Sequence, residues 1–161
     1  MPVPQALVTR YFQLLAFRQF TEAERELERI KQKMHKTEWN RGYFRALYGM
    51  LLSRKANNND LNAFLSKIDL TDKAALHACR REFLEHERSR LHGDFDRGFF
   101  SAWANCMRVL SRMEIPSSVV AGNKNHAAKG VGANVSAGEE WKLATTRADK
   151  NQATIENFID E

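Results

Sequence analysis

Residues 39–47 read WNRGYFRAL, and residues 95–103, which lie 56 positions later, read FDRGFFSAW. Both stretches have an aromatic residue first, then Arg-Gly at the third and fourth places, two aromatic residues, and an alanine at the eighth place. A glycine inside a helix costs about 1 kcal/mol relative to alanine. Its occurrence at the same place in both stretches indicates that two helices approach closely at Gly42 and Gly98.

The same shift of 56 residues places Arg25-Glu26-Leu27 over Arg81-Glu82-Phe83. We therefore favour an internal repeat of two helical hairpins, stacked in parallel orientation as in helical-repeat proteins. The alternative is that two amphipathic helices acquired similar residues independently. The arrangement resembles a tetratricopeptide stack, but that family repeats every 34 residues or so, and no membership is inferred.

Apolar residues recur at helical spacing through most of the first 113 residues, which predicts an all-α fold. The second helix is expected to start at a capping box from Thr21 to Glu24. The later helices are expected to start at Thr37, at Thr71 or Asp72, and at Asp94. Gly93 is the expected stop of the fifth helix. The expected helices cover residues 4–20, 22–36, 38–55, 61–68, 71–91 and 95–113.

The composition changes after residue 116, where Ser, Ala, Gly, Asn and Lys predominate without periodicity. We expect a helical repeat domain over residues 1–115, a disordered tether over 116–150 and a linear motif over 151–161. Residues 1–113 hold 20 Lys+Arg and 13 Asp+Glu (+7), and residues 114–161 hold 5 and 7 (−2), which together give the net charge of +5. The basic excess therefore belongs to the helical part.

Near the end of the sequence, glutamine, aliphatic and aromatic residues stand at Gln152, Ile155, Phe158 and Ile159. A 3₁₀ turn has three residues per turn, so positions 152, 155 and 158 would share one face. This spacing resembles the PIP box, by which many archaeal and eukaryotic replication and repair proteins bind a sliding clamp of the PCNA type. The family usually ends in two aromatic residues, and here the second is the aliphatic Ile159, as archaeal-type versions often accept.

The resemblance implies that Gln152 enters a small polar pocket of the clamp and that the three apolar side chains fill a hydrophobic one. The four residues are therefore the candidate clamp-binding site. The alternative is that residues 151–161 form a helical turn that packs on the helical domain. Trp141 is either a second docking point or a contact with that domain.

No catalytic pattern is visible in the sequence. Glu82 and His86 are four residues apart, whereas di-iron helical proteins use a spacing of three, and Cys79 and Cys106 are isolated. There is no phosphate-binding glycine loop, nucleophile elbow or dinucleotide fingerprint. We expect a non-enzymatic protein with no catalytic residues, no metal and no cofactor.

The sequence has no apolar run of about 18 residues and no secretory signal pattern. Two cysteines without an export signal are typical of a reducing compartment. We therefore expect a cytoplasmic protein, nuclear in a eukaryote, without a membrane partner.

The candidate nucleic-acid-binding residues are arginines of the last two expected helices, since a clustered basic face neutralises phosphates. They are Arg80, Arg81, Arg88, Arg90, Arg97, Arg108 and Arg112. Arg41, Arg45, Arg54 and Lys55 of the third helix would complete a groove for the DNA backbone. The alternative is a solvated face, in which Arg41 and Arg97 pair with acidic residues of a neighbouring helix.

These features together predict an accessory factor of DNA replication or repair that binds a sliding clamp through its PIP box-like motif. Its basic helical domain would contact DNA or another replication protein. One alternative is a protein–protein adaptor with a peptide groove lined by Tyr43, Phe44, Phe99 and Phe100. Another is an RNA- or ribosome-associated basic helical protein.

Overall fold

The computed structural model describes residues 3–55 and 64–116, and every regular element in this part is a helix. The all-α prediction is therefore confirmed for the described part. The predicted loop at 56–60, the predicted tether from residue 117 on and the motif at 151–161 lie outside the described residues. The elements are α1 (Gln5–Ala16), α2 (Phe20–Lys33), α3 (Glu38–Lys55), α4 (Phe64–Lys67), α5 (Lys73–Arg88) and α6 (Asp94–Arg112).

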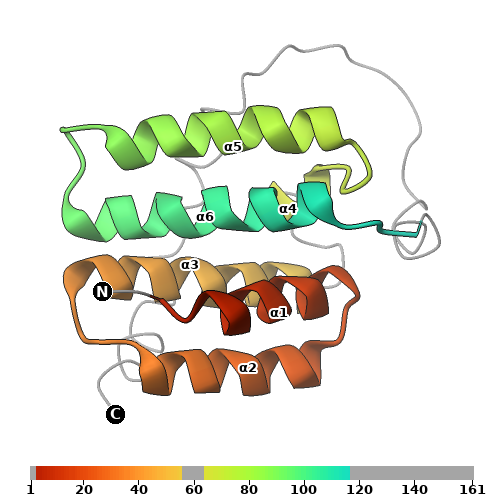
Figure 1. Cartoon of the computed structure of the whole chain (residues 1–161), viewed down its shortest axis with the longest axis horizontal. Coiled ribbons are helices and arrows are strands. Elements are labelled where there is room, and N and C mark those ends of the chain that lie inside the picture. The colour runs from red at the N-terminus through yellow and green to blue at the C-terminus, as the bar shows by residue number, and fades with distance from the viewer. Residues whose placement is uncertain (1–2, 56–63, 117–161) are drawn as a thin grey trace.

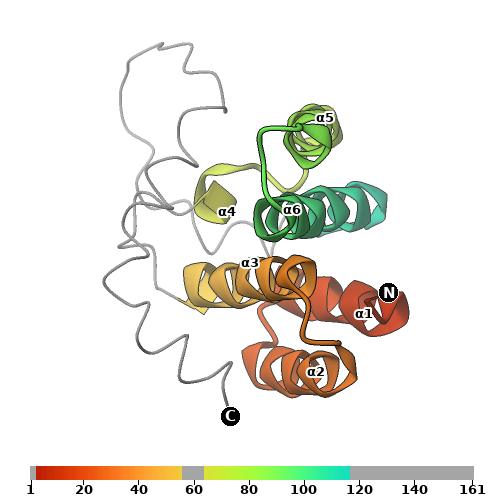
Figure 2. The same cartoon turned by 90° about the vertical axis from the view of Figure 1, so that its left-hand side faces the viewer.

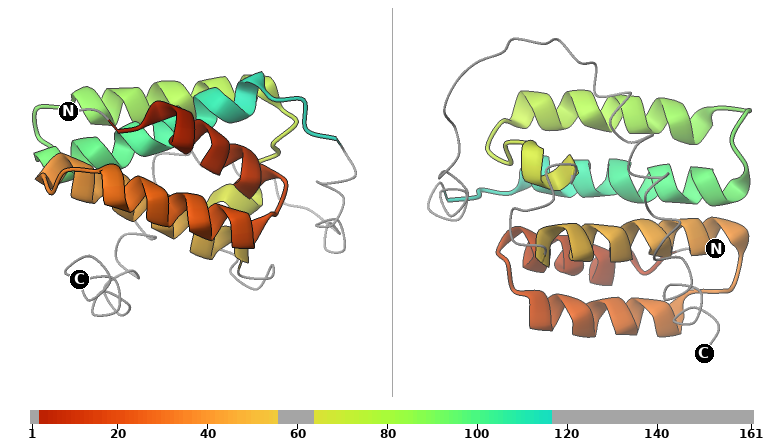
Figure 3. Two further views of the ribbon diagram at one scale, coloured as in Figure 1. Left: turned by 60° about the horizontal axis from the view of Figure 1, so that its bottom comes forward. Right: turned by 180° about the vertical axis from the view of Figure 1, so that it is seen from behind.

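Helix α6 lies between α5 and α3, and α1 lies beside α3, with α2 on the far side of this pair (Figure 1 and Figure 2). Helices α3 and α6 run in the same direction, whereas α5 runs antiparallel to α6 (Figure 1). The view from behind shows the same order, and α4 packs as a single turn beside α6 (Figure 3). The hairpins α2–α3 and α5–α6 thus meet through their second helices.

Helices α3 and α6 are in backbone contact at their two matching glycines, as the sequence predicts. A Cβ atom built on Gly42 would lie 1.9 Å from the carbonyl oxygen of Phe95. A Cβ atom built on Gly98 would lie 1.9 Å from the carbonyl oxygen of Trp39. Real Cβ atoms essentially never approach another atom so closely, so only glycine permits this packing at either position.

The core lies between α1, α3 and α6 and is filled by large side chains. Tyr11 is completely buried, and its hydroxyl donates a hydrogen bond of 2.6 Å to the carbonyl oxygen of Leu47. This bond fixes α1 against α3 and satisfies a phenol that would otherwise be buried without a partner. The largest fully buried side chains are Tyr11, Tyr43, Phe12, Ile30, Leu47, Met50, Leu76, Met107 and Val8.

Two predicted helix caps are confirmed. The Thr37 hydroxyl accepts a hydrogen bond of 3.2 Å from the Asn40 N–H, and α3 has its predicted bounds. The Asp72 carboxylate accepts one of 3.0 Å from the Ala75 N–H at the start of α5. Both side chains satisfy an N–H group that has no partner within its own helix.

The predicted capping box at Thr21–Glu24 is wrong, because α2 begins at Phe20 and its N-cap is Gln19. Helix α1 ends earlier than predicted in a Schellman motif: the N–H groups of Arg18 and Gln19 donate to the carbonyl oxygens of Leu15 and Leu14, respectively. Arg18 takes the left-handed conformation, with φ of 58°. Glycine usually occupies this position, and because an arginine stands here, no residue pattern predicts the early stop.

The predicted stop at Gly93 and cap at Asp94 are also wrong. Helix α5 ends at Arg88, Gly93 is the N-cap of α6 with φ of −70°, and Asp94 is the first residue of α6. The Ser89 hydroxyl accepts a hydrogen bond from the Leu91 N–H, which begins the turn. Leu91 is 95% exposed, so no buried apolar contact extends α5 beyond Ser89.

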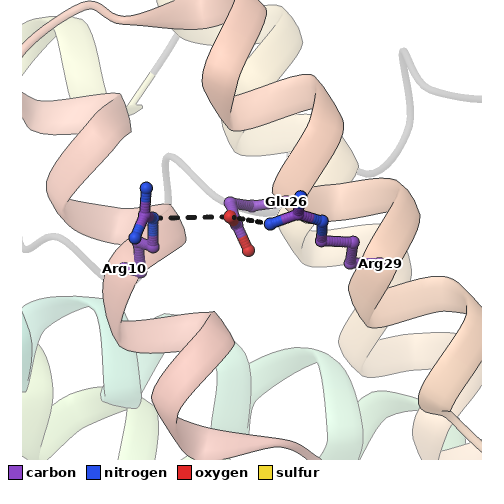
Figure 4. A network of polar contacts seen from close by, with 3 residues as sticks. All are labelled: Arg10, Glu26 and Arg29. Carbon is purple, nitrogen blue, oxygen red and sulfur yellow. Dashed lines mark hydrogen bonds and ion pairs between the residues drawn. The ribbon is translucent and has the colours of Figure 1, made fainter.

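Glu26 is a buried carboxylate between α1 and α2 (Figure 4). Its Oε1 atom lies 2.9 Å from Arg29 Nη1 and 3.4 Å from Arg10 Nε. Its Oε2 atom is buried and has no hydrogen-bond partner in the described part of the chain. Because both arginines remain largely exposed to water, this contact orients α1 on α2 more than it stabilises them.

We predict that Gly42→Ala or Gly98→Ala lowers the free energy of unfolding by about 3 kcal/mol or more, since the added methyl would meet a backbone oxygen that has no rotamer to change. Gly49→Ala is the matched control, because nothing lies within 4 Å of its Cβ position in the same helix as Gly42. It should raise stability by about 0.5–1 kcal/mol. Urea unfolding followed by circular dichroism measures both, and equal effects of Gly42→Ala and Gly49→Ala would contradict the contact.

Candidate functional site

A pocket of about 230 Å³ lies where α5 and α6 face the starts of α1 and α3. We call it the arginine pocket, because two guanidinium groups and one carboxylate are its charged lining groups. Its lining residues are Gln5, Trp39, Tyr43, Arg80, Leu84, Glu87, Ser101, Ala104, Asn105 and Arg108.

Helical periodicity explains which residues line it. From α5 come Arg80, Leu84 and Glu87, and α6 contributes positions 101, 104, 105 and 108. Residues three, four and seven apart lie on one face of a helix. Each helix therefore presents a single stripe of mixed polar and small side chains to the pocket.

Asn105 is at the centre of a hydrogen-bond network in the pocket. Its Nδ2 donates to the Tyr43 hydroxyl at 2.8 Å and to Gln5 Oε1 at 3.1 Å. Its Oδ1 accepts from Arg108 Nε at 3.1 Å and also from Arg108 Nη2. The amide thus joins α1, α3 and α6, and it fixes the plane of the Arg108 guanidinium.

Arg80 enters the pocket without a protein partner. It is half-buried, and no hydrogen bond or ion pair joins its guanidinium to another residue of 3–55 or 64–116. Glu87 is likewise half-buried and unpaired within those residues. It lies seven residues further along α5, about 10 Å along the helix axis.

Ring contacts between α5 and α6 fix the level of Arg80. The ring of Phe83 stacks on those of Phe100 and Trp103, with centroids 6.4 and 5.6 Å apart, and His86 stacks on Phe100 at 4.8 Å. The two helices are antiparallel, so earlier residues of α5 lie beside later residues of α6. Arg80 stands three residues before Phe83 and therefore lies beside Asn105, towards Arg108 along the helix axis.

Trp39 and Tyr43 form the aromatic wall, stacked with centroids 5.2 Å apart. Burial raises the pKa of Tyr43 to about 12, an effect that the hydrogen bond from Asn105 and the charge of Arg108 partly oppose. The phenol therefore stays protonated at neutral pH. Because its oxygen already accepts from Asn105, its own hydrogen is available to a ligand in the pocket.

Of the seven predicted arginines, the structure brings Arg80 and Arg108 together in this pocket and places the other five elsewhere. Arg81 and Arg88 are exposed two turns apart on α5. Arg90 and Arg112 are exposed in the α5–α6 connection and at the end of α6. Arg97 is half-buried, and its Nη2 donates to the Ser89 carbonyl oxygen at 3.5 Å.

The basic residues of α3 have contacts within the protein. Arg54 Nη2 donates to the Ala16 carbonyl oxygen at 3.3 Å, and burial lowers the pKa of Arg54. Lys55 pairs with Glu24, and Arg45 lies over the ring of Phe95 with 5.9 Å to its centroid. These three side chains make contacts with other helices, so they do not form the predicted DNA groove as unpaired basic residues.

Arg41 and Arg97 each pair with an acidic residue of their own helix. Arg41 Nη1 lies 3.0 Å from Glu38, and Arg97 Nη1 lies 3.7 Å from Asp94. In both cases the acidic residue stands three positions earlier. Pairing of both arginines with acidic residues is therefore confirmed, and these two partners belong to the same helix as the arginine.

The peptide groove predicted from four aromatic residues is not present in the described structure. Tyr43, Phe44 and Phe100 are at most 6% exposed, and Phe99 is only partly exposed. These rings fill the space between helices, since aromatic side chains bury the largest apolar area. Only Tyr43 reaches a pocket, through its hydroxyl end.

The two amide residues of the hydrogen-bond network in the pocket were not identified from the sequence. Gln5 and Asn105 are 100 residues apart and belong to no motif. The only sequence signal for Asn105 is a polar residue one turn after Ser101 on the predicted sixth helix. Its hydrogen bonds depend on the packing of three helices, which a pattern within one helix does not show.

Among the described residues, no group of three His, Cys, Asp or Glu side chains is placed to hold a metal ion. Cys106 is buried and Cys79 is half-buried, and burial raises the pKa of both thiols. Within the same part of the chain, no helix is both long enough and apolar enough to cross a membrane.

The described part of the chain is thus a helical body with an excess of basic residues and a mixed polar pocket between α1, α3, α5 and α6. Comparison with protein-family models, curated proteins and solved structures found no match to the chain.

The raised pKa of Tyr43 predicts that stability falls between pH 10 and 12. An unfolded tyrosine ionises near pH 10, whereas the folded Tyr43 holds its proton until about pH 12. The unfolded chain thus binds fewer protons in this window, and the free energy of unfolding falls by up to about 2.7 kcal/mol. Tyr43→Phe should remove this part of the slope in urea titrations from pH 7 to 12. An unchanged slope would show that the phenol is open to solvent.

Proposed function

We propose that the protein is a non-enzymatic accessory factor of DNA replication or repair that binds a PCNA-type sliding clamp. Residues Gln152, Ile155, Phe158 and Ile159 would hold the clamp, and the basic helical body would contact DNA or another replication protein. The observation that carries this proposal is the glutamine–aliphatic–aromatic spacing of these four residues.

The expected affinity of the motif alone is modest. Burial of Ile155, Phe158 and Ile159 gains about 1.5–3 kcal/mol each, and ordering of a peptide takes back several kcal/mol. The remainder corresponds to a dissociation constant on the order of micromolar. A second contact between the body and DNA threaded through the same clamp would strengthen the whole by raising the effective concentration.

The charge distribution supports a role for the body. The excess of basic residues lies in residues 1–113, and Arg81, Arg88, Arg90 and Arg112 are exposed. Arg81 and Arg88 are separated by about 10 Å along α5, a distance that spans about three phosphates of one DNA strand. Helix α5 is therefore the proposed contact with the DNA backbone.

We also propose that the hairpins α2–α3 and α5–α6 are two copies of one unit. The glycines at 42 and 98 make equivalent contacts, and the ion pairs Glu38–Arg41 and Asp94–Arg97 stand at equivalent positions. Duplication of a hairpin explains why both second helices use glycine at the same turn.

For the clamp, we predict micromolar binding of the full chain to an archaeal PCNA-type clamp in calorimetric titration. Phe158→Ala should weaken it at least tenfold, because the phenyl ring is the largest apolar group of the motif. Asn157→Ala is the matched control, since position 157 lies off the face shared by 152, 155 and 158. An intact chain that does not bind, or an equal loss in both variants, would refute clamp binding through this motif.

For DNA, we predict that the Phe158→Ala chain binds a fluorescent duplex and that affinity falls steeply with salt. Replacing Arg81 and Arg88 with Gln should weaken binding and lower the salt slope by about 2, one for each phosphate contact. The control replaces Arg25 and Lys33, two exposed residues of α2, with Gln. Equal losses in the two double variants would indicate attraction by net charge and refute a contact through α5.

A further inference from the structure

We propose that the arginine pocket binds an oxyanion, a carboxylate or phosphate group attached to a small apolar stem, between Arg80 and Arg108. This inference does not depend on the motif at 152–159. It assigns to these two arginines a different task from that of the exposed arginines of α5: they would enclose one anionic group, whereas the exposed ones would follow a DNA backbone.

Several hydrogen-bond donors of the pocket have no acceptor among the described residues. The Arg80 guanidinium carries five N–H donors, and none is bonded to a residue in the described part of the chain. The Tyr43 hydroxyl accepts from Asn105 and retains its own hydrogen. Water can hydrate these half-buried donors in the unliganded protein, so they are available to a ligand that enters the pocket. A carboxylate or phosphate, which only accepts hydrogen bonds when ionised, supplies the missing partners.

The Arg108 guanidinium is held in place before a ligand binds. Arg108 donates through both Nε and Nη2 to one oxygen of Asn105, and Asn105 is itself held by Tyr43 and Gln5. The guanidinium therefore does not need to be ordered when a ligand arrives. A binding group whose rotamer is already fixed loses less entropy on association.

The lining of the pocket carries a net positive charge. Arg80 and Arg108 contribute two positive charges, and Glu87 contributes one negative charge. The sum is one positive charge, which a monoanion neutralises. Glu87 lies about two helical turns from Arg80 on α5, and no hydrogen bond or ion pair joins the two side chains within the described part of the chain.

The pocket has the size of a small ligand. A volume of about 230 Å³ equals the liquid volume of roughly eight water molecules, below the typical 300–1,000 Å³ of sites for drug-sized ligands. It suits an oxyanion with a few carbon atoms, or one end of a larger molecule. The stem would pack on Leu84 and on the stacked rings of Trp39 and Tyr43.

The test is NMR titration of the ¹⁵N-labelled full chain with inorganic phosphate, acetate and benzoate, each at constant ionic strength. We expect saturable shifts of the Trp39 indole and of residues 101–108 with at least one probe. Benzoate binding more tightly than acetate would identify a carboxylate with an apolar stem, and a phosphate-selective response would identify a phosphate ligand. Either result supports the proposal.

The variants separate this pocket from general attraction. Arg80→Gln should reduce affinity at least tenfold while leaving the melting temperature unchanged, because Arg80 has no partner among the described residues. Arg81→Gln, at the neighbouring exposed position, is the matched control and should bind as the unaltered chain does. Arg80→Lys keeps the charge without the planar fork and should bind with intermediate affinity.

No saturable shift with any of the three probes would overturn the proposal, as would equal affinities of Arg80→Gln and Arg81→Gln. Repeating the titration on the Phe158→Ala chain distinguishes this inference from the proposed clamp function. The pocket should bind its probe equally well in that variant, whatever happens to clamp binding.

Discussion

The contact between the backbones of α3 and α6 is the constraint on which the rest of the structure depends. Gly42 and Gly98 each lie against a carbonyl oxygen of the other helix, where a Cβ atom would have only 1.9 Å. This approach holds α6 between α3 and α5 and lets α1 reach α6 (Figure 2). The hydrogen bonds from Asn105 to Tyr43 and Gln5 require the same spacing. The pocket therefore depends on the two glycines, whose lack of a Cβ atom allows α3 and α6 to approach this closely.

The helix contacts explain both the successes and the failures of prediction from the sequence. The glycine contact, the Thr37 and Asp72 caps and the bounds of α3 were predictable because each depends on a local signal with a single physical meaning. The end of α1 was not, because an arginine occupies the left-handed position where glycine is usual. Tertiary packing overrode local preference there.

The candidate site was predictable only in part. The seven arginines can be read from the sequence, but their partners depend on how neighbouring helices are aligned along their axes. The Arg97 side chain donates a hydrogen bond to the Ser89 carbonyl oxygen. Arg80, on the neighbouring helix, lines the arginine pocket and has no partner among the described residues. The aromatic residues were misread for a related reason: a stripe of rings at helical spacing predicts a buried face as well as an open groove, and here they are largely buried.

Glu26 and Arg80 show two different ways of placing a charge away from water. Glu26 is 3% exposed, and its Oε1 atom contacts two arginines that remain largely exposed to water. Its Oε2 atom is buried without a hydrogen-bond partner among the described residues. Arg80 lies in a pocket that water can enter, and its donors can be hydrated there at little cost to the fold. An oxyanion that replaces this water gains charge-assisted hydrogen bonds in a site whose second guanidinium is already fixed. A water-filled pocket therefore lowers the stability of the fold very little, and an anion that displaces the water gains hydrogen bonds from both arginines.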